Sequence, residues 1–197
     1  MSEVHEGFHP GLEAWPYDPE RARELLAEAG YPDGFAIDMQ VPSGRYTLDR
    51  ETGEVIASQL AQVGIRVDLN PMEWGVFETR RREGRSMGLT YVGHGATSDG
   101  IGNYHSMFTT GEPLGAGLYY SDPEIDRLNQ IALSTLAVDE QLAAIHSVAE
   151  KVAEDALAVF LFHPVEIYAV REGIDFNPMP SEHLDLISGW VFERILD

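Results

Sequence analysis

The residues whose types and spacing come closest to a catalytic pattern lie near the amino terminus. His5, Glu6 and His9 fit the H-E-x-x-H pattern, in which two imidazoles on one helix face bind zinc and the glutamate activates the zinc-bound water. That chemistry requires a helix, and Gly7 and Pro10 both oppose one here. The pattern therefore indicates a polar terminal segment, with a zinc metallohydrolase as the unfavoured alternative.

Other side chains that could do chemistry lie in a glycine-rich stretch, residues 93–120. His94 and His105 are possible metal ligands, but no acidic or histidine partner stands at metal-ligand spacing, so ordinary hydrogen bonds are the simpler interpretation. The chain has no G-x-S-x-G, no P-loop and no G-x-G-x-x-G that opens a helix. It also has no cysteine, which excludes thiolate chemistry and disulfides. We expect no catalytic residue, no metal and no cofactor.

The composition of the chain excludes several kinds of partner. Its 33 acidic and 13 basic residues give a formal net charge of -20, which makes binding to nucleic acid or anionic lipid unfavourable. No apolar run approaches the roughly 20 residues that a membrane-spanning helix needs. Residues 1–10 lack the basic and apolar regions of a signal peptide. With 197 residues and 44% hydrophobic content, the chain can bury a substantial core.

The first half of the chain alternates helical and strand patterns. Asp18 is a suitable N-cap followed by Pro19, apolar residues then recur at helical spacing, and Gly30 ends the helix. Alternating apolar residues bounded by turns follow, as in half-buried strands. This order favours a sheet with right-handed crossovers. The predicted helices cover 18–29, 48–63 and 73–83, and the predicted strands cover 35–41, 65–69 and 87–92.

The second half of the chain is less regular. Residues 93–120 show no period, which predicts a long loop with a function or at an edge. Two helices are predicted next, one opened by the capping sequence at 121–124 and one over 138–155. The apolar run 158–170, AVFLFHPVEIYAV, predicts a buried strand pair or one kinked strand. The tail from residue 173 onward is predicted to be a crossing segment, and its end, LDLISGWVFERILD at 184–197, is apolar enough to require a partner surface.

Several stretches, taken together, resemble one known family. Residues 17–35 read YDPERARELLAEAGYPDGF and are similar to the YDPEKAKxLLAEAGYPDGF segment of bacterial family-5 extracytoplasmic solute-binding proteins, which serve dipeptide, oligopeptide, nickel, glutathione and sugar importers. The match is long and specific, and the resemblance runs to about residue 175. Its further anchors are ASQLAQVGIRV at 57–67, Glu73-Trp74, and YSDPEIDRL at 120–128.

The resemblance implies a fold and a kind of protein. We expect an α/β chain, a mixed sheet with flanking helices, that forms the C-terminal lobe of a periplasmic binding protein-like II fold. Residues 1–172 are predicted to be this ligand-binding lobe, and 173–197 a segment that returns toward an N-terminal lobe. Members of the family are not enzymes; they capture a solute between two lobes in the periplasm and deliver it to ABC permease subunits. A truncated chain, a split gene and a free-standing lobe all stay open.

In such proteins the loops at the carboxyl ends of the strands face the ligand, as is general for open α/β sheets. Here those loops cover 42–47, 72–74 and 93–104. Arg45 is the one permanent cation in the first loop and can hold a carboxylate through two hydrogen bonds, although a solvated arginine is an equally simple interpretation. The predicted ligand-binding residues are Arg45, Tyr46, Trp74, His94, Thr97, Asp99 and Asn103.

The third loop departs from the pattern of peptide-binding members. In those members a G-W-x-x-D sequence supplies an aspartate for the peptide α-ammonium group, whereas residues 93–97 read GHGAT here. Thr97 stands in place of the carboxylate, and a buried ammonium left unpaired is costly. Asp99 could substitute only if the loop takes a different path. We expect a ligand that is polar but uncharged at this position, or a different solute.

A protein-interaction domain is the remaining alternative to a solute-binding lobe. In that case the acidic surface and the apolar tail after residue 173 would bind another protein. A stable dimer formed through the tail would favour this function over the capture of a solute.

Overall fold

The chain divides into two compact units, which we describe one at a time. A computed structural model describes residues 7–86, 88–94, 100–165, 167–176 and 190–192, with the backbone alone for 174–176 and 190–192. Residues 13–93 form the first unit, called the sheet unit below. Residues 1–12 and 94–197 form the second, called the helical unit. The predicted boundary at residue 172 stays a prediction, because most residues after it lie outside the described ranges.

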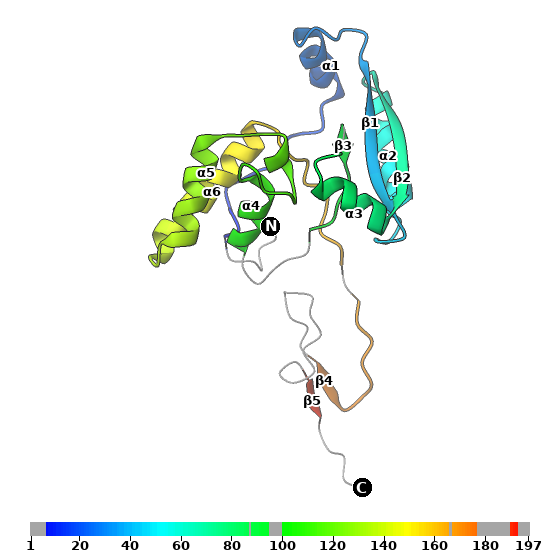
Figure 1. Cartoon of the computed structure of the whole chain (residues 1–197). Coiled ribbons are helices and arrows are strands. Elements are labelled where there is room, and N and C mark those ends of the chain that lie inside the picture. The colour runs from blue at the N-terminus through cyan, green and yellow to red at the C-terminus, as the bar shows by residue number, and fades with distance from the viewer. Residues whose placement is uncertain (1–6, 87, 95–99, 166, 177–189, 193–197) are drawn as a thin grey trace. The chain divides into compact units, whose positions relative to one another are not determined.

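The sheet unit is built on three parallel strands in the order β2-β1-β3 (Figure 1). Strand β1 (Phe35–Ser43) pairs along its whole length with β2 (Ile65–Glu73), from Phe35↔Ile65 to Ser43↔Glu73. Strand β3 (Leu89–Thr90) pairs with the middle of β1 on the other side, with Met39 opposite Leu89. The predicted α/β class with flanking helices is confirmed, and the sheet of this unit, predicted to be mixed, is parallel.

The sheet unit also contains three helices, close to where they are predicted. Helix α1 (Pro19–Glu28) is capped by the Asp18 carboxylate, which accepts a hydrogen bond from the Arg21 backbone N–H at 2.8 Å. Helix α2 (Asp49–Ala61) contacts both β1 and β2, as the ribbon shows (Figure 1). Helix α3 (Trp74–Arg82) follows β2 directly and contacts β1 and β2.

The helical unit packs three helices around one apolar core. Helix α4 contacts both α5 and α6, and α5 contacts α6. Side chains from all three helices are buried together, among them Ile101, Ile125 and Ile145. The elements are α4 (Gly100–Phe108), the short 3-10 helix η1 (Ala116–Leu118), α5 (Pro123–Ser134) and α6 (Val138–Glu154).

Two predictions for this unit are wrong. The stretch 93–120 contains helix α4, because Ile101, Tyr104 and Phe108 lie at helical spacing and bury together, a period that the surrounding glycines obscure in the sequence. The apolar run 158–170 forms no strand in its described part, and most of its side chains are exposed, with Val165 at 85% and Ile167 at 89%. Within the described ranges, no strand pairs with this run.

The remaining described elements are the short strands β4 (Ile174–Phe176) and β5 (Trp190–Phe192). They pair antiparallel, with Ile174 opposite Phe192. Among the described residues, no helix combines the length and the apolar character that crossing a membrane requires.

Candidate functional site

Aromatic side chains from three separate strand ends meet at the carboxyl edge of the sheet. The Tyr46 ring lies edge-on to Trp74, with centroids 6.0 Å apart, and edge-on to Tyr91 at 6.1 Å. Trp74 in turn stacks on the buried Phe77, with centroids 5.6 Å apart. These four rings, called the aromatic cluster, come from the loop after β1, from the start of α3 and from the chain after β3. They meet because parallel strands end at the same edge of a sheet.

Arg45 covers this cluster with its guanidinium group. The Arg45 Cζ atom lies 5.3 Å from the centroid of the Tyr46 ring and 5.2 Å from that of Trp74, distances typical of cation–π contacts. Within the described part of the chain, Arg45 forms no ion pair, whereas arginines such as Arg21 and Arg127 do. In a chain with a net charge of -20, the cluster therefore presents a positive charge that has no acidic partner among the described residues.

A buried carboxylate holds the loop that carries Arg45 and Tyr46. Asp49 is 4% exposed, and its two oxygens accept hydrogen bonds from four backbone N–H groups. Burial alone would raise the pKa of Asp49, but these donors outweigh it and the pKa lies below its ordinary value. The loop therefore has an ionised anchor at neutral pH. The donors are Tyr46, Arg45, Gly44 and Arg50.

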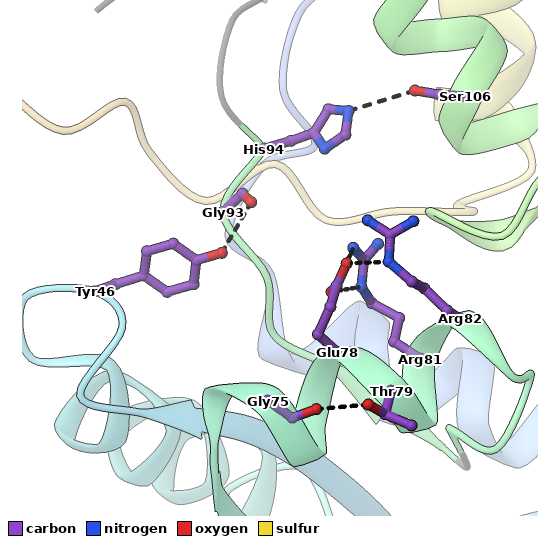
Figure 2. Close-up of polar contacts among 9 residues, drawn as sticks. All are labelled: Tyr46, Gly75, Glu78, Thr79, Arg81, Arg82, Gly93, His94 and Ser106. Atoms are coloured by element: carbon purple, nitrogen blue, oxygen red, sulfur yellow. Dashed lines mark hydrogen bonds and ion pairs between the residues drawn. The ribbon is translucent and has the colours of Figure 1, made fainter.

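Tyr46 is fixed at its other end by the chain after β3. Its hydroxyl donates a hydrogen bond to the Gly93 carbonyl oxygen at 3.0 Å, and the two groups face each other in Figure 2. The approach is so close that a Cβ atom at Gly93 would stand 2.9 Å from Tyr46 Cε1. Partial burial raises the pKa of the Tyr46 hydroxyl, which therefore stays protonated and acts as a donor.

Helix α3 places Trp74 through its own polar contacts. The Glu73 carboxylate accepts hydrogen bonds from the backbone N–H groups of Gly75 at 2.8 Å and Val76 at 3.3 Å, which caps the helix directly beside Trp74. One turn later, Glu78 binds Arg81 at 2.7 Å and Arg82 at 2.6 Å (Figure 2). Burial opposes ionisation of Glu78, but both arginines outweigh it and lower the pKa of that carboxyl.

The other predicted site residues lie after residue 93 in the chain, beyond the sheet unit. His94 and Asn103 belong to the helical unit. The exposed His94 ring has its Nε2 atom 3.5 Å from Ser106 Oγ (Figure 2), and the Asn103 carbonyl accepts a hydrogen bond from the same hydroxyl at 3.1 Å. Thr97 and Asp99 lie outside the described residues.

Reasoning from the sequence missed Asp49, Phe77 and Tyr91 as parts of this site. Asp49 falls inside a predicted helix, where an acidic residue is ordinary. Its place three residues after the sequence Gly44-Arg45-Tyr46 is the signal that could have indicated a backbone anchor. Tyr91 lies at the end of a predicted strand, so its partners depend on strand order.

The zinc alternative loses its support where the structure describes it. His5 and Glu6 lie outside the described residues, and residues 7–12, which include His9, form turns and no helix. The His9 ring accepts a hydrogen bond from the Gly11 N–H at 3.0 Å and lies 3.0 Å from Glu150 Oε1. No group of three or more histidine or acidic side chains in the described ranges is arranged to hold a metal ion. His9 therefore serves to attach the first residues to α6.

The chemistry available at the aromatic cluster is binding. Arg45 supplies a permanent cation, and Tyr46 and Trp74 supply flat apolar faces beside it. The arrangement suits a small solute that has an anionic group, such as a carboxylate, next to apolar surface.

Sequence comparisons show which known proteins this chain resembles. A family model described as bacterial extracellular solute-binding proteins, family 5 middle, matches residues 2–114. The glutathione-binding protein GsiB of Pectobacterium atrosepticum is 32% identical over 162 residues, covering 78% of this chain and 30% of the relative. Di/tripeptide-binding protein 2 of Pseudomonas aeruginosa is 34% identical over 95 residues, covering 47% and 18%. The chain thus spans less than a third of the length of these relatives.

Solved structures show the same fold. The ABC transporter-associated periplasmic binding protein DppA from Helicobacter pylori, in complex with the peptide STSA, has a TM-score of 0.69 at 24% identity, covering 79% of this chain and 30% of that one. The oligopeptide-binding protein AppA from Bacillus subtilis, in complex with a nonapeptide, has a TM-score of 0.80 at 19% identity, covering 98% and 41%. At these identities the likeness concerns the fold alone.

Proposed function

This chain belongs to the bacterial extracellular solute-binding proteins of family 5, and from that premise we propose that it forms one wall of a cleft that captures a peptide or another small polar solute. In this proposal the chain is a part of the solute-binding component of an ABC importer, acts in the periplasm, and hands its ligand to permease subunits. It does no chemistry on the ligand. The names of its relatives, which bind glutathione and small peptides, support this solute class.

The observation that carries the proposal is the state of Arg45. Its guanidinium lies over two aromatic rings, forms no ion pair within the described residues, and stands at the carboxyl edge of the sheet. Ligands of open α/β sheets bind at that edge. A solute carboxylate would give Arg45 the bidentate partner that it lacks there, while the rings would cover the apolar part of the solute.

The direct test is a titration of the 197-residue chain with the dipeptide Met-Leu and with reduced glutathione, followed by NMR. We expect weak binding, with a dissociation constant above about a micromolar, because one wall supplies only part of the contacts of a cleft. The amide shifts that move should include those of residues 44–47. Arg45→Gln should weaken binding about tenfold or more, and Arg45→Lys should recover only part of it. Shifts confined to other surfaces would contradict the proposal.

The residues of the third loop stay predictions. If Thr97 stands where peptide binders carry a carboxylate, N-acetylation of Met-Leu should change its affinity by less than about threefold. Asp99→Asn should have an equally small effect. Loss of binding on acetylation, together with the same loss in the Asp99→Asn variant, would show that Asp99 supplies the carboxylate.

One observation favours a second candidate, a protein-interaction role. The segment 159–165 exposes several large apolar side chains, including Phe160 at 57% and Phe162 at 60%. If light scattering at about 100 μM finds a monomer for both the unaltered chain and the Phe162→Ser variant, self-association is removed from consideration.

A further inference from the structure

The anchor beneath Arg45 has a role of its own in the proposed site. We propose that Asp49 is a positioning residue for ligand binding: it holds the loop 44–47 so that Arg45 and Tyr46 take their places over and within the aromatic cluster. The inference rests on the proposed function of this edge as a binding site. Asp49 itself would not touch the ligand, because its oxygens already accept four hydrogen bonds.

The first step of the argument is the convergence of consecutive backbone groups on one side chain. Oδ2 accepts from the Arg45 N–H at 2.9 Å and the Tyr46 N–H at 3.1 Å, and Oδ1 accepts from the Gly44 N–H at 3.3 Å and the Arg50 N–H at 2.8 Å. Three adjacent N–H groups that point to one spot form an anion-binding concavity. Here the chain fills that concavity with its own carboxylate.

The second step is the loop's backbone conformation, which needs an external constraint. Leu48 adopts a left-handed conformation with φ 56, and Gly44 adopts one with φ 79. A leucine disfavours this region, and its side chain is 62% exposed, so packing of the side chain does not hold it there. The hydrogen bonds to Asp49, together with those that the Leu48 carbonyl accepts from Thr52 N and Oγ1 at 2.8 Å, stabilise the turn.

The third step connects this anchor to the binding groups. The Arg45 guanidinium is exposed, and no ion pair from the described residues ties it down, so its place over Tyr46 and Trp74 depends on where its backbone is held. The Asp49 carboxylate holds that backbone at Arg45 N, and the adjacent Tyr46 at its own N–H. A long side chain on a mobile loop would lose more entropy on binding a solute than one already in position.

The experiment compares Asp49→Asn and Asp49→Ala with the matched control Asp139→Asn, an exposed acidic residue in the first turn of α6. Two measurements need no ligand: amide exchange at residues 44–46, and the ring-current shifts of the Arg45 side-chain protons. A third is the affinity for Met-Leu and for its C-terminal amide, measured by NMR titration on the 197-residue chain.

We expect Asp49→Asn to speed amide exchange at 44–46 about tenfold and to abolish most of the ring-current shift of Arg45. Met-Leu should bind about tenfold more weakly, while the amide, which lacks the carboxylate, should change little. Asp49→Ala should show larger effects, and about 100 mM acetate should restore part of the Arg45 shift by refilling the concavity. Asp139→Asn should leave all three measurements unchanged.

Two results would overturn the inference. One is a folded Asp49→Asn chain that keeps both loop protection and the Arg45 ring-current shift. The other is a chain whose loop loosens while the affinity for Met-Leu stays the same, which would leave Asp49 a purely structural role. If the unaltered chain binds neither probe, the proposed function fails, and the two ligand-free measurements still decide whether Asp49 positions Arg45. If Asp49→Ala does not fold, Asp49→Asn carries the test.

Discussion

The helical unit and the sheet unit differ in where they bury apolar surface. In the helical unit, side chains from α4, α5 and α6 form a continuous core. In the sheet unit the fully buried large side chains are few, chiefly Val41 and Phe77, and α1 buries no residue. Four aromatic side chains of the sheet unit gather instead at one edge of the sheet, beside Arg45. The comparison teaches that one unit concentrates its buried apolar side chains in a core, while the other gathers aromatic side chains at the sheet edge where we propose that a ligand binds.

The largest effect is expected from a cavity in the helical core. Ile145 is fully buried, so Ile145→Ala should lower the free energy of unfolding of this unit by about 3 kcal/mol, through lost burial and an unfilled space. Urea denaturation with hydrogen exchange resolved by segment measures it. Leu136→Ala, at a fully exposed side chain, is the control and should cost little. Equal loss of protection in β1 would show that the two units unfold together, and the comparison would fail.

A pH-dependent effect is expected at the start of α5 in the helical unit. Lys151 Nζ lies 2.7 Å from Asp122 Oδ2, and mainly this contact lowers the pKa of Asp122 from 3.8 to about 2. Because the folded pKa is the lower one, the contact stabilises the unit above pH 3.8, and this stability is lost as the pH falls through 3.8 toward 2. Thermal unfolding of Asp122→Asn should show a smaller loss over this interval than the unaltered chain. Parallel curves would contradict it.

A smaller effect is expected at the edge of the sheet unit. Gly93→Ala would place a methyl group 2.9 Å from the Tyr46 ring, so the ring or the chain must move, at a cost of about 1 kcal/mol. The near-ultraviolet circular dichroism of the aromatic cluster should change with it. In a Tyr46→Ala background the same substitution should cost nothing measurable. A cost that persists there would mean that the close approach to Tyr46 is not its source.

The smallest expected effect is a gain. Leu48 has φ 56, a region that asparagine tolerates better than leucine, so Leu48→Asn should raise the free energy of unfolding by about 0.5 kcal/mol. Leu48→Val, with a branched Cβ, should lower it instead. Chemical denaturation of the three chains gives the order. If asparagine is no better than valine, the left-handed backbone at Leu48 is not strained.

The elements of the first half could be predicted from the sequence because their signals are local. Asp18 and Gly30 mark the ends of α1, and the alternation of apolar residues marks β1 and β2. Helix α4 was missed because its glycines hide a period that only the core makes meaningful. The run 158–170 was misjudged because apolar composition predicts burial without showing which partner supplies it.

For the candidate site, the sequence by itself determined the residue types and the loops that carry them, including Arg45, Tyr46 and Trp74, since strand ends can be located from local patterns. The family resemblance followed from residue order alone. Only the tertiary structure decided that Tyr46, Trp74 and Tyr91 meet, and that Asp49 gathers the backbone of the Arg45 loop. The physical reason is that strand order and register bring residues far apart in the chain to the same sheet edge, and no local pattern encodes these distances.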